Sequence, residues 1–198
     1  MVKVFLDCDG VLADFDGHCE AVFGEKPVRE EGETKDRLKA QMRAHGSFYR
    51  DLPLKSDAMR LYEALAHANP VILTGCPEGG WAEPQKVAWA AEHFPGVPIL
   101  TCRSSQKYKH ARHYSLLIDD YLKYAGLWRD AGGIFLHHKD TERTLATLIT
   151  YEAMFSLGIW PMPKFNEKPI ARRLYEELGV AAETIQSVRR EMFCAALL

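Results

Sequence analysis

The sequence contains no long hydrophobic run, since no apolar stretch approaches the ~20 residues that a membrane-spanning helix needs. It also lacks a basic leader followed by an apolar segment of signal-peptide length, because a strand-like run begins at Val2. Both absences argue against a membrane or secreted protein. We therefore expect no membrane association and a cytoplasmic location.

Cysteine is scarce and is poorly spaced for metal binding or a disulfide framework. The 198-residue chain has 5 cysteines, an odd number, and none of them stands in a Cys-x-x-Cys pair. This pattern disfavours structural zinc and fits a reducing compartment. A strong charge of either sign is missing too, since the formal net charge is −2. We therefore expect no nucleic-acid partner.

Short apolar runs alternate with amphipathic segments along most of the chain. Each run is 4 or 5 residues long and almost entirely apolar, as in strands that are covered on both faces of a parallel sheet. This alternation predicts an α/β fold with a doubly wound, Rossmann-like parallel sheet. The expected strands are 2–6, 70–73, 97–100, 115–118 and 133–136, and the expected helices are 14–24, 30–45, 56–68, 82–94, 121–131 and 141–157.

One interval is too long for a single crossover helix, because more than 60 residues separate the first strand from the second. We expect a small helical cap at 15–55, inserted after the first strand above an α/β core of 1–14 and 56–160. Residues 161–198 are expected to form a C-terminal helical extension. It either packs on the core or contributes the face of a homodimer.

Polar side chains capable of chemistry follow the expected strands at their carboxyl ends. In a doubly wound sheet these ends line one crevice where ligands bind. Clustered carboxylates without His or Cys partners favour a hard cation such as Mg²⁺. An Asp can attack phosphorus while a second carboxyl transfers protons, so the set predicts phosphoryl transfer. The residues are Asp7 and Asp9 after the first strand, Thr74 and Gly75 after the second, and Asp119 and Asp120 after the fourth.

Three segments resemble motifs of the haloacid dehalogenase (HAD) superfamily. They are DCDGVLADF at 7–15, ILTG at 72–75 and LLIDD at 116–120. The chain most resembles the branch of 5'(3')-deoxyribonucleotidase-like phosphatases, whose cap-exit segment is similar to FYRDLP at 48–53. The resemblance covers roughly residues 1–150. It implies a Mg²⁺-dependent phosphatase for a small phosphorylated substrate, with (deoxy)nucleoside monophosphates expected first.

The resemblance also implies a role for each acid. Asp7 would be the nucleophile and a metal ligand. Asp9 would be the general acid and base, with its backbone carbonyl on the metal. Asp120 would bind Mg²⁺ directly, and Asp119 would orient it or a metal-bound water.

Phosphate-binding groups are implied next to these acids. Thr74 and Gly75 would hold the phosphate, together with a lysine that is either Lys107 or Lys109, of which Lys107 has the preferred spacing from Ser104. Two positions depart from the branch. Gly75 stands where a serine is common, and Tyr121 stands where a basic residue is common. Both departures affect the identity of the substrate more than the reaction.

Aromatic residues near the cap have two readings. Phe15, Phe48 and Tyr49 either fill the core of the cap or stack on a nucleobase. Two other functions also stay open. One is a HAD phosphatase for a sugar phosphate or a nucleic-acid end, and the other is a non-catalytic HAD-like binding protein. The presence of both Asp7 and Asp9 disfavours the last of these.

Overall fold

A parallel sheet of 5 strands in the order β3-β2-β1-β4-β5 forms the centre of the molecule. The structure is a computed structural model, and it describes residues 3–28, 32–113, 115–156, 181, 183–184 and 186–188. The predicted doubly wound parallel fold is confirmed, with each described strand boundary within 2 residues of its expected place. The strands are β1 (Val4–Leu6), β2 (Val71–Gly75), β3 (Ile99–Cys102), β4 (Leu116–Asp119) and β5 (Ile134–His137).

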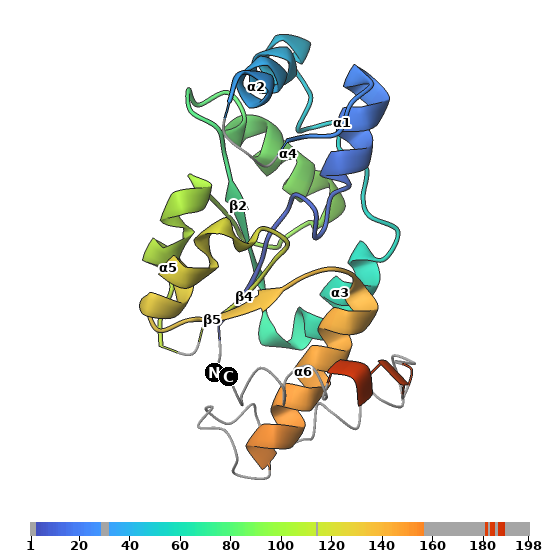
Figure 1. Ribbon diagram of the computed structural model, residues 1–198, viewed down its shortest axis with the longest axis vertical. Helices are drawn as coiled ribbons and strands as arrows, with labels where there is room; N and C mark the ends of the chain where they lie inside the picture. The colour runs from blue at the N-terminus through green and yellow to red at the C-terminus, as the bar shows by residue number, and fades with distance from the viewer. Residues whose placement is uncertain are drawn as a thin grey trace.

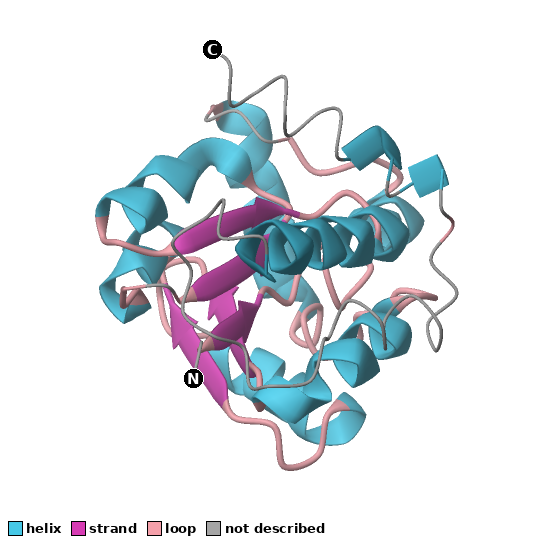
Figure 2. Cartoon of the chain, turned by 90° about the horizontal axis from the view of Figure 1, so that it is seen from below, coloured by secondary structure: helices cyan, strands magenta, loops and turns pink. Residues whose placement is uncertain are grey.

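Helices cover both faces of this sheet (Figure 2). The last α-helix before β2 is α3 (Ala58–Leu65), and the α-helices after β2 are α4 (Glu83–His93), α5 (Ala125–Asp130) and α6 (Thr141–Ser156). Short 3₁₀ turns extend or connect them, namely η1 (Ala66–Ala68), η2 (Ser104–His110) and η3 (Leu122–Tyr124).

The strands carry continuous apolar runs because both of their faces are buried. Val4 and Leu6 pack into one hydrophobic cluster, while Phe5 between them packs into a second cluster on the opposite face. There the ring of Phe5 meets Trp128 of α5 edge-on, with 5.5 Å between ring centroids. Successive side chains of a strand point to opposite faces, so an alternating pattern would have left one face polar.

Two helices follow β1 and lie above the carboxyl end of the sheet (Figure 1). They are α1 (Phe15–Phe23) and α2 (Glu33–His45). Asp14 caps α1 by accepting a hydrogen bond from the backbone N–H of Gly17. These helices occupy the place expected for the cap, while the division of the chain into core, cap and extension stays a prediction.

The two linkers between the cap helices and the sheet pair with each other. The backbone N–H of Asp14 donates to the carbonyl of Pro53 over 2.8 Å, and Lys55 donates to the carbonyl of Leu12 over 2.9 Å. The chain therefore enters and leaves the cap through one hydrogen-bonded crossing beside the loop that follows β1.

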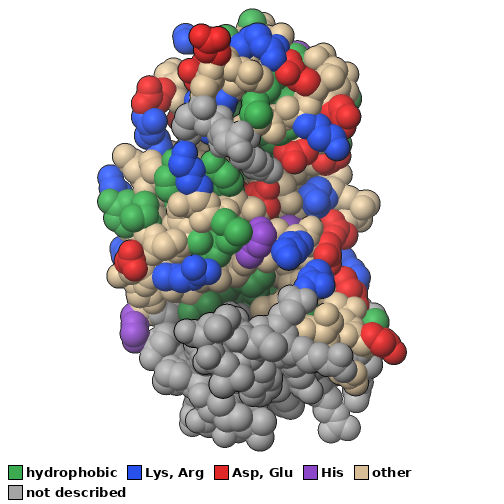
Figure 3. Space-filling model, in the orientation of Figure 1, with side chains coloured by type: hydrophobic (Ala, Val, Ile, Leu, Met, Phe, Trp, Pro, Cys, Tyr) green, Lys and Arg blue, Asp and Glu red, His purple; other side chains and the backbone are tan. Residues whose placement is uncertain are grey.

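Most of the predicted C-terminal extension lies outside the described residues. Within it, Val188 is buried in the main core cluster, and the backbone N–H of Ala181 donates to Glu142 of α6 over 2.7 Å. No helix of the described ranges has the length and apolar character to cross a membrane. Basic and acidic side chains are interspersed over the described part of the face in Figure 3, in line with the small net charge.

Candidate active site

The acids predicted at the strand ends meet where the strand order reverses. β1 and β4 are neighbours in the sheet, and the register pairs Leu6 with Ile118. Asp7 therefore emerges beside Asp119, and its backbone N–H donates to the carbonyl of Ile118 over 2.9 Å. Such a switch point is the usual place for a ligand in this class of fold.

Three carboxylates gather there, and one lysine contacts two of them. Asp7, Asp119 and Asp120 each present an oxygen within 4.8 Å of the others. The ammonium of Lys107 lies 2.7 Å from Asp7 Oδ1 and 2.7 Å from Asp119 Oδ2. With the acids ionised, one ammonium leaves this cluster two negative charges in excess. An all-oxygen site with that charge fits a hard divalent cation such as Mg²⁺.

Burial and charge together set the protonation of this cluster. Burial raises the pKa of Asp7, and the neighbouring Lys107 opposes that rise. Burial alone would lower the pKa of Lys107, but Asp7 and Asp119 hold it above its ordinary value. Lys107 is therefore a permanent ammonium at the bottom of the site, whereas Lys109 is exposed on η2.

A second buried lysine, which the sequence did not single out, holds the other acid of the loop. Lys86 of α4 donates to Asp9 Oδ2 over 2.5 Å, to Thr74 Oγ1 over 2.9 Å and to the carbonyl of Gly75 over 2.9 Å. Its side chain is fully buried. One sequence signal exists, because Lys86 stands three and four residues before the buried pair Trp89 and Ala90, on the apolar face of the helix.

Asp9 presents one of its two carboxylate oxygens to Lys86 and keeps the other outside that contact. Asp9 Oδ1 is buried and has no hydrogen-bond partner among the described residues. Burial raises the pKa of Asp9, and the ammonium of Lys86 opposes that rise. A carboxyl with a raised pKa and an uncommitted oxygen is suited to donate a proton to a ligand.

Counting donors distinguishes the two lysines. An ammonium has three N–H donors. Lys86 directs them to its three protein acceptors, so it acts on a ligand only through Asp9 and Thr74. Lys107 has two carboxylate partners, which leaves one N–H for a phosphate oxygen.

Gly10 allows the loop that follows β1 to approach Asp120. Its φ is +77°, in the left-handed region that favours glycine. A Cβ placed there would lie 2.4 Å from Asp120 Oδ2. The turn is closed by the carbonyl of Cys8, which accepts from Leu12 and Ala13 over 2.8 Å each. A side chain at position 10 would displace the acid predicted to bind the metal.

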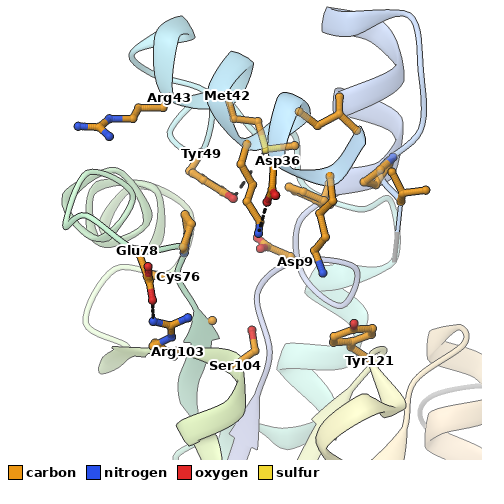
Figure 4. A pocket seen from close by; sticks show the side chains of 18 of the residues that line it. Asp9, Asp36, Met42, Arg43, Tyr49, Cys76, Glu78, Arg103, Ser104 and Tyr121 are labelled. Carbon is orange, nitrogen blue, oxygen red and sulfur yellow. Dashed lines mark hydrogen bonds and ion pairs between the residues drawn. The ribbon is translucent and has the colours of Figure 1, made fainter. Parts of the chain in front are cut away.

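A cavity of about 570 Å³ opens between α2 and the loop that follows β1. Asp9, Gly75 and Ser104 line it from the core side. Figure 4 shows Tyr49 and Tyr121 on opposite sides of Asp9. Aromatic rings thus form much of its wall, namely those of Phe15, Tyr49, Trp81, Tyr121 and Tyr124.

The three aromatic candidates from the sequence divide between cavity and core. Phe15 and Tyr49 line the cavity. Phe48 is fully buried and does not line it. Its ring packs 5.3 Å from the centroids of Phe23 and of Tyr49 and 5.8 Å from that of Phe15. The structure therefore places Phe48 in the core of the cap, behind the rings that face the cavity.

No protein-family model and no curated protein matches the chain. The solved structures that are similar to it include the following three. A hydrolase from Pseudomonas syringae is 11% identical over 69% of this chain and 84% of its own, with a TM-score of 0.40. L-2-haloacid dehalogenase from Xanthobacter autotrophicus, with chloropropionic acid covalently bound, is 14% identical over 90% of this chain and 100% of its own, with a TM-score of 0.48. A family IA, variant 3 HAD hydrolase from Entamoeba histolytica is 13% identical over 96% of this chain and 100% of its own, with a TM-score of 0.39. Likenesses of this size assign no activity to this chain.

The carboxylate cluster predicts how Mg²⁺ changes stability. Added Mg²⁺ should raise the melting temperature of the protein, because an ion that binds only the folded state stabilises it. In Asp120→Asn the apparent affinity for Mg²⁺ should fall at least about tenfold, since one charged ligand is lost. Thermal unfolding over a Mg²⁺ titration measures both. The matched control is Asp130→Asn, an exposed acid of α5, and an equal response of Asp120→Asn and the wild type would contradict the metal site.

The contacts of Lys86 predict a large effect on stability. Lys86→Met should lower the free energy of unfolding by about 3 kcal/mol or more, because it leaves the carboxylate of Asp9 without its counter-ion. Adding Asp9→Asn to that variant should recover part of the loss. Urea denaturation of the two single variants and the double variant measures the coupling. Lys109→Met should stay within about 0.5 kcal/mol of wild type. If Lys86→Met lowered the free energy of unfolding by no more than that, Lys86 would not be the counter-ion on which the buried Asp9 depends.

Proposed function

We propose that this chain is a Mg²⁺-dependent phosphomonoester hydrolase of the HAD type, which works in the cytoplasm through an aspartyl-phosphate on Asp7. One observation carries the proposal. Two acids of a single loop, Asp7 and Asp9, have different buried lysines as partners. Asp9 lines the large cavity and Asp7 lines a small one, and Ser104 and Tyr121 border both cavities. One acid is thereby suited to attack and the other to transfer a proton.

Asp7 is proposed to attack phosphorus in the first step. Among the described residues, its hydrogen bonds from Cys8 and Lys107 both go to Oδ1, so Oδ2 is the attacking oxygen. A bond forms between Oδ2 and phosphorus while the bond from phosphorus to the ester oxygen breaks. The ester oxygen leaves with the proton of Asp9 Oδ1.

Water completes the cycle in the second step. The carboxylate of Asp9 takes a proton from a water molecule, whose oxygen attacks phosphorus. The bond from phosphorus to Asp7 Oδ2 then breaks. The products are inorganic phosphate, the free carboxylate of Asp7 and a protonated Asp9 that is ready for another substrate.

The remaining groups hold the phosphate during both steps. Lys107 has an N–H to donate to an equatorial oxygen. Thr74 Oγ1 accepts from Lys86, so its own O–H is available to donate to another. Mg²⁺, held by Asp7, Asp119 and Asp120, would offset the negative charge of the phosphate.

The wall of the cavity supports a nucleotide as substrate. Its volume of about 570 Å³ lies in the range of ~300–1,000 Å³ that small-molecule pockets occupy. A nucleobase presents two π faces, and aromatic side chains lie on both sides of Asp9, with Tyr49 on one and Tyr121 on the other (Figure 4). We therefore propose (deoxy)nucleoside monophosphates as the substrate class.

Phosphate release from a panel of esters tests the proposal. The panel holds 5'- and 3'-nucleoside monophosphates, sugar phosphates and a 5'-phosphorylated oligonucleotide, each with Mg²⁺ or with EDTA. We expect turnover that needs Mg²⁺ and is fastest for nucleoside monophosphates. Asp7→Asn should abolish it, and Asp9→Asn should lower kcat by about 100- to 10,000-fold, the usual worth of a general acid.

Asp130→Asn is the control for both variants and should keep the wild-type rate. Turnover that survives Asp7→Asn would contradict the nucleophile. Turnover of sugar phosphates or of the oligonucleotide alone would keep the chemistry and remove the nucleotide assignment. A folded, Mg²⁺-bound protein that releases phosphate from no ester would overturn the enzymatic proposal.

A further inference from the structure

We infer that the cap carries a subsite for a second anionic group of the substrate, formed by Lys35 and Lys39 of α2. The ligand class is then a phosphomonoester that bears another phosphate or a carboxylate away from the bond that breaks. This inference rests on the proposed function, because it narrows the substrate class for the same cavity.

The basic residues of α2 that border the cavity follow one helical row. Lys35, Lys39 and Arg43 are spaced four residues apart, so they lie on one side of the helix. All three line the cavity. Beside them run Leu38 and Met42, which are buried and line the cavity as well. Packing of this apolar pair fixes the rotation of α2 and thereby turns the lysines toward the cavity.

The basic side chains of this row differ in how far they are buried. Lys35 and Lys39 are half-buried, whereas Arg43 is exposed, and Figure 4 shows Arg43 extending away from Asp9 at the rim. The two lysines are therefore the inner members. The side chain of Lys39 is 41% exposed, so its ammonium is only partly screened by water from an anion in the cavity.

Only one acid of α2 faces the same cavity, and it is weakly held. Asp36 points from α2 toward Asp9 (Figure 4), and its Oδ1 lies 3.3 Å from the ammonium of Lys39. The side chain of Asp36 is 74% exposed. An exposed pair of this kind contributes little to stability, so an anion of the ligand can replace Asp36 beside Lys39 at small cost.

The lining of the cavity has one more basic than acidic side chain. The residues that border the cavity include four basic and three acidic side chains. Glu78 pairs with Arg103, and Asp9 is neutralised by Lys86 from behind the wall. In the proposed function, Lys107 and the predicted metal already bind the phosphate that reacts. Lys35 and Lys39 line the large cavity whereas Lys107 lines the small one, so the positive charge of α2 suits a different group of the ligand.

Binding to the inactive variant Asp7→Asn tests this subsite without turnover. Calorimetry compares adenosine 3',5'-bisphosphate with adenosine 5'-monophosphate, which differ by one phosphate. A second pair, 3-phosphoglycerate and glycerol 3-phosphate, tests a carboxylate in the same way. We expect the ligand with the extra anion to bind tighter in at least one pair. Lys35→Gln with Lys39→Gln should weaken that ligand tenfold or more, and its matched mono-anion less than threefold.

Arg37→Gln is the matched control on the same helix. It removes one positive charge that pairs with Glu25 rather than lining the cavity. It should change both affinities less than twofold, with thermal unfolding as the check on folding. Equal weakening of both ligands by the lysine variant, or no preference for the extra anion in either pair, would overturn the subsite.

Turnover of p-nitrophenyl phosphate by the wild type separates the two hypotheses, because this ester has no second anion. If p-nitrophenyl phosphate is hydrolysed but the extra anion gives no tighter binding that depends on the two lysines, the proposed function stands and the subsite fails. If no ester is hydrolysed but the lysine-dependent preference exists, the subsite stands and the proposed function fails.

Discussion

The ammonium of Lys107, shared between Asp7 and Asp119, is the interaction on which the rest of the site depends. The doubly wound sheet brings the ends of β1 and β4 together, and the chain has acids at both ends. Buried carboxylates this close repel one another and lose their hydration, so they need cations. Lys107 supplies one positive charge. The proposed Mg²⁺ would offset the remaining negative charge, so that the phosphate of the proposed substrate would meet cations rather than bare acids.

The second lysine connects this chemistry to the cap. Lys86 donates a hydrogen bond to Asp9, and its ammonium lies 4.5 Å from the centre of the Tyr49 ring. Its neighbour Gln85 accepts a hydrogen bond from the backbone N–H of Tyr49 over 2.9 Å. Adjacent residues of α4 thus hold both the proposed proton donor and the segment by which the chain leaves the cap. Helix α4 therefore links the exit segment of the cap to Asp9.

Sequence reasoning reached the residues whose place follows from strand ends. Asp7 and Asp119 were predictable because a parallel sheet aligns the ends of its strands, and this alignment does not depend on side-chain contacts. The role of Lys86 was not predictable, because a lysine in a helix usually faces water. Its burial is decided by Asp9, which lies 77 residues away in the chain. The choice between Lys107 and Lys109 needed the path of η2. Phe48 and Tyr49 are neighbours that only the packing of the cap could separate.

The most direct test of the account is to trap the phosphorylated side chain. Acid quench during turnover, followed by borohydride reduction, converts an aspartyl-phosphate to homoserine, which peptide mass spectrometry locates. The account predicts homoserine at position 7 and at no other acid, and only when substrate and Mg²⁺ are both present. Homoserine at Asp9 or Asp119, or none during active turnover, would contradict covalent catalysis by Asp7.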